Sequence, residues 1–259
     1  MIKFIIITQP RSGSSFLTSS LSSHPQIHCQ RGSLFTKRNL SPVTWFRPNF
    51  LSVDRKKSPY YKYRSSSLRR QIAHRFCRHQ LVQEFLSEWY VKFKNSPVVG
   101  FKVNYSQLNR YPAAISWIKD NEVKVIHLVR NNLLKRHVSN LVAIKRNRRH
   151  SKVPGELKPT KVHVDTKNIL EDFRRRQKRF EKFRRKFRDL PFLEIHYESM
   201  LADLDEEANK ILRFLSIDQI MPLTTDHVKV NPDALKEIIE NYVEVKNTLK
   251  NTEFERFLY

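Results

Sequence analysis

The fold of this chain is decided by the stretch Thr-Gln-Pro-Arg-Ser-Gly-Ser-Ser-Phe-Leu, residues 8–17. It follows an apolar run from Ile2 to Ile7, in which Lys3 is the only charged residue. It leads into residues 17–21, where apolar residues return at helical spacing. This pattern predicts a buried strand, a tight turn and a helix, in that order.

The turn has the composition of an anion-binding loop. Its backbone N–H groups would converge at the positive end of the helix dipole, and Gly13 would let a ligand approach the backbone closely. Arg11 adds a formal positive charge, and further hydrogen bonds can come from the hydroxyls of Ser12, Ser14 and Ser15. The alternative is a serine-rich helix cap after an edge strand. The triphosphatase motif Gly-x-x-x-x-Gly-Lys-Ser/Thr is absent, so a site for phosphate plus magnesium is not expected.

The remaining segments alternate between strand and helix patterns. Apolar runs predict strands over residues 26–29, 98–105, 122–130 and 191–198. Helical spacing predicts helices over residues 67–95, as one helix or a broken pair, and over 112–119, 166–190 and 201–218. Residues 36–66 keep no period and predict a long, irregular, basic insertion. We therefore expect residues 1–259 to form a single α/β domain.

Positive charge is concentrated in two segments of the chain. The formal net charge is +24, and residues 31–80 hold 13 Lys or Arg and one acid, while residues 135–190 hold 20 Lys or Arg and six acids. Such fields attract anionic partners, and composition alone fits nucleic acid, an anionic lipid surface or an anionic glycan. Only two cysteines are present, without Cys-x-x-Cys spacing, so neither a disulfide framework nor a zinc site is predicted.

The loop resembles a known nucleotide-binding motif. Residues 10–15 after a strand are similar to the 5′-phosphosulfate loop of the sulfotransferases that use 3′-phosphoadenosine 5′-phosphosulfate, above all in the bacterial-type carbohydrate and glycolipid branch, which has Arg where other members have Lys. The resemblance implies a P-loop-like three-layer sandwich, with a central, mainly parallel sheet flanked by helices. It also implies that 3′-phosphoadenosine 5′-phosphosulfate is the sulfuryl donor, with no metal, and that it is bound by Arg11, Ser12, Gly13, Ser14, Ser15 and Phe16.

A second motif follows in the order that this family shows. Arg130 ends the run over residues 122–130, and Ser139 follows nine residues later. The pair resembles the family's 3′-phosphate motif, which combines a guanidinium fork with a hydroxyl donor at a helix start. The late segment 227–232 resembles the basic segment that closes over the nucleotide, which makes Lys229 another expected ligand of the 3′-phosphate. Together the two motifs predict a site for a 3′-phosphorylated nucleotide.

Two further positions bear on catalysis. Gly100-Phe101-Lys102, followed by a tyrosine, resembles a branch motif whose lysine lies near the transferred sulfuryl group. Lys102 therefore joins Arg11 as an expected catalytic residue, the alternative being a strand lysine that reaches solvent. The family commonly has a glutamate, its proposed general base, where this chain has Ser33. Because serine is a poor proton acceptor near neutral pH, His28 becomes a candidate substitute, with a structural role as its alternative.

The resemblance implies transfer of a sulfuryl group to a hydroxyl of a carbohydrate, glycolipid or polysaccharide. It covers nearly the whole chain except residues 36–66, where we expect acceptor specificity to lie. The arginine-rich segment 166–190 would be a solvated helix face or a platform for an anionic acceptor or an anionic membrane. The apolar N-terminal run is too short for a signal peptide or a membrane span, so we expect a cytoplasmic protein with peripheral membrane contact as an option.

Two other functions stay open. One is a catalytically degenerate module of the same fold, which binds a nucleotide or a polyanion but lacks the glutamate that Ser33 replaces. The other is a nucleic-acid-binding protein driven by the basic segments. No recognisable nucleic-acid-binding motif supports that second alternative, so it is the less expected of the two.

Overall fold

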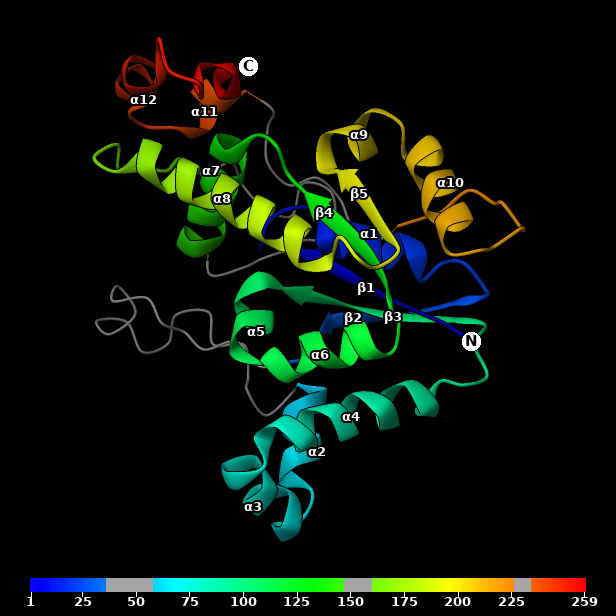
Figure 1. Ribbon diagram of the computed structural model, residues 1–259. Helices are drawn as coiled ribbons and strands as arrows, with labels where there is room; N and C mark the ends of the chain where they lie inside the picture. Colours follow the sequence, from blue (N-terminus) through cyan, green and yellow to red (C-terminus); the bar gives the residue numbers. More distant parts are fainter. Residues whose placement is uncertain (36–57, 147–159, 226–233) are drawn as a thin grey trace. The chain divides into compact units, whose positions relative to one another are not determined.

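The computed structural model describes residues 1–35, 58–146, 160–225 and 234–259, which fall into two compact units (Figure 1). The first unit consists of Met1–Val129 and Lys186–Thr225, and the second of Arg130–Arg185 and Asp226–Tyr259. All the strands that form a sheet in the described residues belong to the first unit. The second unit is built from helices and one isolated β-bridge, between Val162 and Ile239.

A five-stranded parallel sheet forms the centre of the first unit (Figure 1). Its strand order is β2-β3-β1-β4-β5, and every neighbouring pair is parallel. The strands are β1 (Ile2–Thr8), β2 (Ile27–Ser33), β3 (Val98–Asn104), β4 (Lys124–Val129) and β5 (Phe192–His196). Strands were predicted at all five places, and the predicted α/β fold with a central parallel sheet is confirmed.

Helices cover both faces of this sheet, as Figure 1 shows, which gives the predicted three layers. On one face lie α1 (Ser14–Leu21) and α10 (Leu204–Phe214), and on the other lie α4 (Arg78–Lys92) and α6 (Pro112–Asp120). In α4, the rings of Trp89 and Tyr90 pack on Phe101 of β3, and Tyr90 also stacks on Trp117 of α6. Because alternate residues of a strand face opposite sides, each strand contributes to both layers of core.

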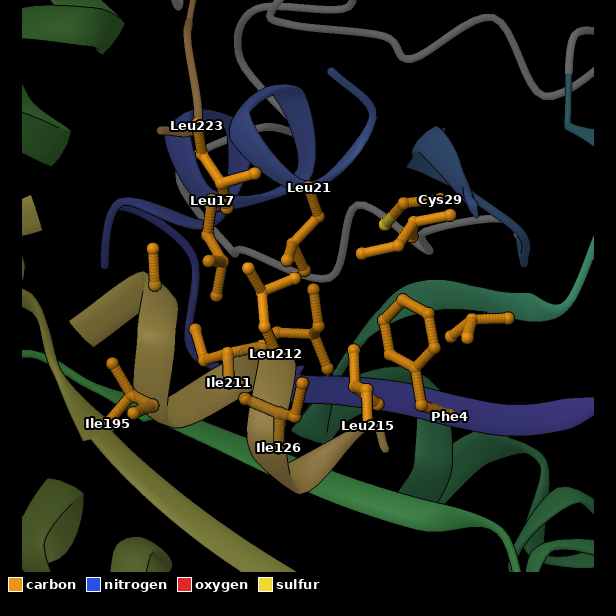
Figure 2. Close-up of a cluster of buried hydrophobic side chains, with 14 of the residues drawn as sticks. Phe4, Leu17, Leu21, Cys29, Ile126, Ile195, Ile211, Leu212, Leu215 and Leu223 are labelled. Atoms are coloured by element: carbon orange, nitrogen blue, oxygen red, sulfur yellow. The ribbon is translucent and has the colours of Figure 1, made fainter. Parts of the chain in front are cut away.

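The core between the sheet, α1 and α10 is drawn in Figure 2. Leu17 and Leu21 of α1 meet Leu212 of α10, and Leu215 directly after it, above Phe4 of β1, and each of these side chains is at most 1% exposed. Burial of one such side chain contributes about 1.5–3 kcal/mol. This packing fixes α1 against the sheet, and thereby fixes the turn that precedes α1.

Several strand ends differ from the prediction, among them the carboxyl ends of β2, β3 and β5. β2 continues to Ser33, where a turn from Gln30 was expected, because a register irregularity and a left-handed Gly32 (φ 89°) let the pairing resume. β3 ends at Asn104, which forms a capping box that starts α5 (Tyr105–Arg110). β5 ends at His196, and α9 (Tyr197–Ala202) follows it directly.

Several predicted helices are interrupted. The helix expected over residues 67–95 is a broken pair, α3 (Leu68–Phe76) and α4, which meet at Cys77. The helix expected after β5 breaks at Asp203, whose carboxylate accepts from the Glu206 N–H at 2.8 Å and caps α10. Most of the predicted irregular insertion lies outside the described residues. Its last part is not irregular, because Ser58 caps a further helix, α2 (Pro59–Ser65).

The second unit is organised around α7 (Leu133–Lys145) and most of α8 (Ile169–Phe187). Its C-terminal part contains α11 (Leu235–Ile238), α12 (Tyr242–Leu249) and the 3-10 turn η3 (Glu255–Leu258). Five apolar side chains of α8 are at most 6% exposed: Ile169, Phe173, Phe180, Phe183 and Phe187.

Candidate anion-binding site

The turn between β1 and α1 has a backbone that few sequences adopt. Arg11 (φ 68°) and Gly13 (φ 81°) both lie in the left-handed region, which costs a non-glycine residue about 1–2 kcal/mol. A Cβ on Gly13 would lie 2.2 Å from Cδ2 of Tyr197, so the tyrosine ring, and not only a ligand, requires glycine there. Such turns direct successive N–H groups into one concavity that suits an anion.

No side chain caps the backbone N–H groups in the first turn of α1. Gly13 occupies the N-cap position and offers no side-chain cap, while its carbonyl accepts from the Leu17 N–H at 3.0 Å. Ser14 and Ser15 already belong to the helix. The alternative prediction of a serine-capped helix is therefore wrong, and the helix start has the form that anion sites use.

Ser12 carries a buried hydroxyl that no group among the described residues satisfies. Its side chain is 1% exposed, and its Oγ has no hydrogen-bond partner within the described parts of the chain. A buried polar group left in this state costs about 1–3 kcal/mol. Nearby, Thr8 Oγ1 donates to the Leu128 carbonyl at 2.8 Å and ties the end of β1 to β4. The site therefore fits an anion with several acceptor oxygens, such as a phosphosulfate.

The structure brings Lys102 to this loop. The ammonium of Lys102 donates to Ser15 Oγ at 3.4 Å from its place near the carboxyl end of β3. In the sheet register, Lys102 pairs with Ile6 of β1 on one side and with Ser33 of β2 on the other. The backbone position at which the family commonly has its glutamate therefore adjoins Lys102.

His28 lies at the opposite end of the sheet. It pairs with Val99, which is three residues, or about 10 Å of strand, before Lys102. Its ring stacks on Phe93 with a centroid distance of 3.7 Å and an interplanar angle of 15°. Burial lowers the pKa of His28 below its usual value. The structure gives His28 a place in an aromatic stack and does not support it as the substitute base.

The other residues predicted to bind the nucleotide lie in different parts of the fold. Phe16 packs against the core cluster of Figure 2. Arg130 follows the last residue of β4, and Ser139 is buried in the second turn of α7, although a hydroxyl at a helix start was expected. The start of α7 is capped by Asn132, whose Oδ1 accepts from the Lys135 N–H at 2.8 Å. Lys229 lies outside the described residues.

A buried polar chain was missed by the sequence prediction. The Tyr105 hydroxyl bonds to His127 Nε2, and His127 Nδ1 bonds to a carboxylate oxygen of Glu194 at 2.9 Å. His127 is 0% exposed. Its place inside the apolar run of β4 is the feature of the sequence that could have indicated a buried hydrogen-bonded histidine. These hydrogen bonds hold the start of α5, directly after β3, against β4 and β5. They therefore position the segment that follows Lys102.

The described ranges lack two features. They contain no group of three His, Cys, Asp or Glu side chains that could hold a metal ion. None of their helices is both long enough and apolar enough to cross a bilayer.

The chain is similar to one protein family in sequence and to solved structures in fold. A family model described as the sulfotransferase family matches residues 4–220, whereas no curated protein sequence matches. A crystal structure of a sulfotransferase from Alicyclobacillus acidocaldarius superposes with a TM-score of 0.50 at 13% identity, over 90% of this chain and 87% of that chain. Weaker similarity is found to mouse sulfotransferase SULT7A1 complexed with PAP, with a TM-score of 0.42, 14% identity, and 99% and 87% coverage.

The family match agrees with the arrangement of the site. It extends over most of the chain and includes the anion-binding turn, the lysine of β3 and the arginine that follows β4. The Alicyclobacillus structure, at low identity, shows the same fold for nearly the whole chain. From the family match and the parallel-sheet fold together, we conclude that the chain belongs to the sulfotransferase family.

Proposed function

We propose that this sulfotransferase takes 3′-phosphoadenosine 5′-phosphosulfate as its donor and a hydroxyl of a carbohydrate, glycolipid or polysaccharide as its acceptor. The family uses this nucleotide. The observation that carries the proposal is the buried hydroxyl of Ser12, which has no hydrogen-bond partner among the described residues, in a left-handed turn near the ammonium of Lys102.

The donor would be bound at two places. Arg11 and the N–H groups of residues 12–15 would hold the 5′-phosphosulfate, since they combine formal charge with a helix start. Arg130 and Ser139, which belong to the second unit, are proposed as ligands of the 3′-phosphate because they match the family motif in type and spacing. Lys229 is proposed as a further ligand on sequence alone.

The residues of the turn would act as positioned charges. The nucleotide, when bound, supplies an activated sulfuryl group for in-line transfer to a hydroxyl. Negative charge then grows on the non-bridging oxygens and on the leaving phosphate oxygen. Arg11 and Lys102 would stabilise that charge, and the fixed turn would hold the reacting atoms in line. Since Ser33 replaces the family's glutamate, we expect the rate to depend mainly on these donors.

The acceptor and the place of the reaction are proposed from charge. Two strongly basic segments suit an acceptor that is itself anionic, and an anionic membrane surface would suit them equally. We therefore propose a cytoplasmic enzyme that works on an anionic glycan or glycolipid, with peripheral contact to a membrane.

Ligand-dependent thermal stability tests the donor site. Adenosine 3′,5′-bisphosphate should raise the Tm of the full chain, because a ligand at 100 times its Kd stabilises by about 2.7 kcal/mol. ATP, which lacks the 3′-phosphate, should give a much smaller shift. An Arg130→Ala variant should lose most of the difference between the two nucleotides. Equal shifts by both, or none at millimolar ligand, would contradict the proposal.

Transfer of labelled sulfate tests the reaction. With 3′-phosphoadenosine 5′-phosphosulfate carrying ³⁵S, label should appear in a glycan or glycolipid fraction and not in nucleic acid or protein. The replacement of the glutamate by Ser33 favours one second candidate, a module that only binds the nucleotide. That candidate is correct if the bisphosphate stabilises the chain but no acceptor fraction gains label.

A further inference from the structure

Helix α3 turns its apolar side to solvent. Leu68, Ile72 and Phe76 are 72%, 52% and 74% exposed, and α3 has no buried residue. The three side chains are spaced four residues apart, which places them on one continuous ridge of a helix with 3.6 residues per turn. A surface helix normally buries such a ridge and exposes its charges.

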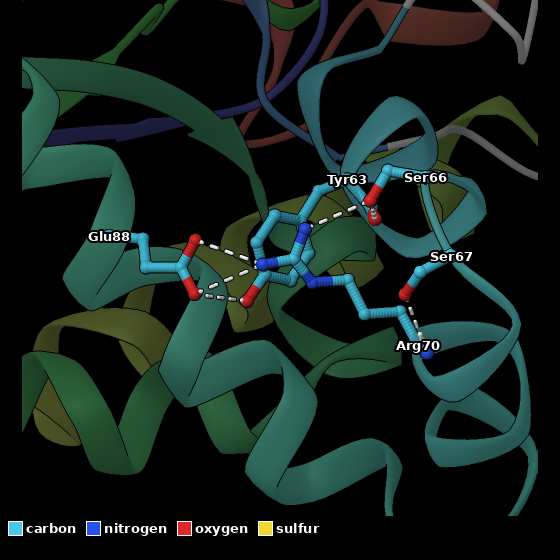
Figure 3. Close-up of polar contacts among 5 residues, drawn as sticks. All are labelled: Tyr63, Ser66, Ser67, Arg70 and Glu88. Atoms are coloured by element: carbon cyan, nitrogen blue, oxygen red, sulfur yellow. Dashed lines mark hydrogen bonds and ion pairs between the residues drawn. The ribbon is translucent and has the colours of Figure 1, made fainter.

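The opposite side of α3 holds the helix to the protein through polar groups. Figure 3 shows Arg70 donating to both carboxylate oxygens of Glu88 in α4, at 3.2 and 3.3 Å, and to Ser66 Oγ at 2.9 Å. The guanidinium also lies over the ring of Tyr63, 3.8 Å from its centroid. One turn later, His74 Nδ1 bonds to the Tyr60 hydroxyl at 3.1 Å. These contacts fix the helix with its ridge facing outward.

Cations border the ridge on both sides. At about 100° per residue, Arg69 follows Phe76 around the helix, and Arg75 precedes Leu68 on the other flank. Both arginines are exposed, and the Arg75 guanidinium lies 5.6 Å from the centre of the Phe76 ring. Residues 59–79 contain six Lys or Arg and no Asp or Glu. An apolar ridge between cations is the pattern of helices that lie in the interface of an anionic bilayer.

We propose that α3 docks on an anionic lipid bilayer, with Leu68, Ile72 and Phe76 inserted among the lipids and Arg69 and Arg75 against their phosphates. A second copy of the chain is a poorer occupant, because pairing through this face would bring the cations of both copies together. The membrane contact is independent of sulfuryl transfer. Failure to bind vesicles would remove the peripheral membrane contact from the proposed function but leave nucleotide binding and sulfuryl transfer untouched, and failure of nucleotide binding would leave the docking surface untouched.

Co-sedimentation with vesicles tests the ridge. The full chain should sediment with vesicles of phosphatidylcholine mixed with phosphatidylserine, and much less with phosphatidylcholine alone. The triple variant Leu68→Gln/Ile72→Gln/Phe76→Gln should bind the mixed vesicles at least about tenfold more weakly, because three apolar side chains no longer enter the interface. Val91→Gln in α4 is the matched control, since Val91 is 62% exposed but stands off the ridge, and it should bind as the parent chain does.

Charge and environment give two further readouts. The pair Arg69→Gln/Arg75→Gln should weaken binding to the mixed vesicles about tenfold and remove the preference for anionic lipid. In an Ile72→Trp variant, the tryptophan emission should shift to the blue when mixed vesicles are added. This variant retains the apolar ridge, so it reports even if the triple variant does not fold. Absence of vesicle binding by the parent chain overturns the proposal, as does self-association in sedimentation analysis that the triple variant abolishes.

Discussion

The two ends of the parallel sheet place their polar groups in different surroundings. At the amino end, Lys3 donates to Asn121 Oδ1 at 2.9 Å, and Lys124 donates to the Phe214 carbonyl at 2.7 Å. His28 at the same end stacks on Phe93. Both ammonium groups are thus bonded within the protein, and the His28 ring is held by aromatic packing, although its Nε2 is buried without a hydrogen-bond partner in the described residues.

The carboxyl end is built differently. There Ser12 keeps a buried hydroxyl without a partner in the described residues, and Arg11 holds a left-handed backbone. Lys102 reaches toward the same turn. Parallel α/β sheets bind ligands beyond the carboxyl ends of their strands, and this difference follows that rule. Proximity to this end, and not residue type, separates candidate catalytic groups from structural ones.

Arg11→Ala should have the largest effect. Loss of a positioned cation that stabilises transferred charge costs about 10²- to 10³-fold in kcat/KM. Arg11→Lys keeps the charge and should recover all but about tenfold of that loss, as expected where a guanidinium fork is replaced by a point charge. Initial rates with labelled donor measure both variants. If Arg11→Ala retains full activity, the turn is not the donor site, and the contrast between the two ends fails.

Lys102→Met should come next, with a loss of about 10²-fold in kcat. Lys3→Met at the amino end of β1 is the matched control, because it removes the same charge from the same sheet, and its activity should stay within about twofold. Comparable losses in the two variants would show that net charge, and not position, sets the rate. Melting curves of both variants separate this effect from unfolding.

The strands and the turn at this carboxyl end were predictable from the sequence for a physical reason. The apolar runs and the Gly and Ser residues between them are local signals, and parallel strands bring their ends together. Distant contacts were not predictable in the same way. The stack of His28 on Phe93 joins residues 65 positions apart, and the hydrogen bonds of His127 join two strands and a helix. For α3, the helical period predicted an amphipathic helix but not which side the protein would cover.

A glycine comparison tests the turn itself. Gly13→Ala should destabilise the chain by about 2–4 kcal/mol, because the new Cβ meets the Tyr197 ring at 2.2 Å and φ is +81°. Gly32→Ala has the same backbone problem, with φ +89°, but its Cβ would meet nothing within 4 Å, so about 1–2 kcal/mol is expected. Urea unfolding measures the difference between the variants. Equal losses would mean that Tyr197 yields to the new methyl group, and Gly13→Ala/Tyr197→Ala should then bring no recovery.

The smallest effect is expected for His28→Phe at the amino end. The aromatic stack on Phe93 survives this change, so activity should stay within about twofold. Burial lowers the pKa of His28 below 6.5, so as the pH falls through 6.5 the unfolded chain gains a proton that the folded chain does not. The free energy of unfolding of the parent chain therefore decreases as the pH falls. The His28→Phe variant should lose less of this free energy than the parent chain between pH 7 and pH 5. A large drop in kcat, or the loss of one limb of the pH–rate profile, would instead place His28 in the reaction and erase the distinction between the two ends.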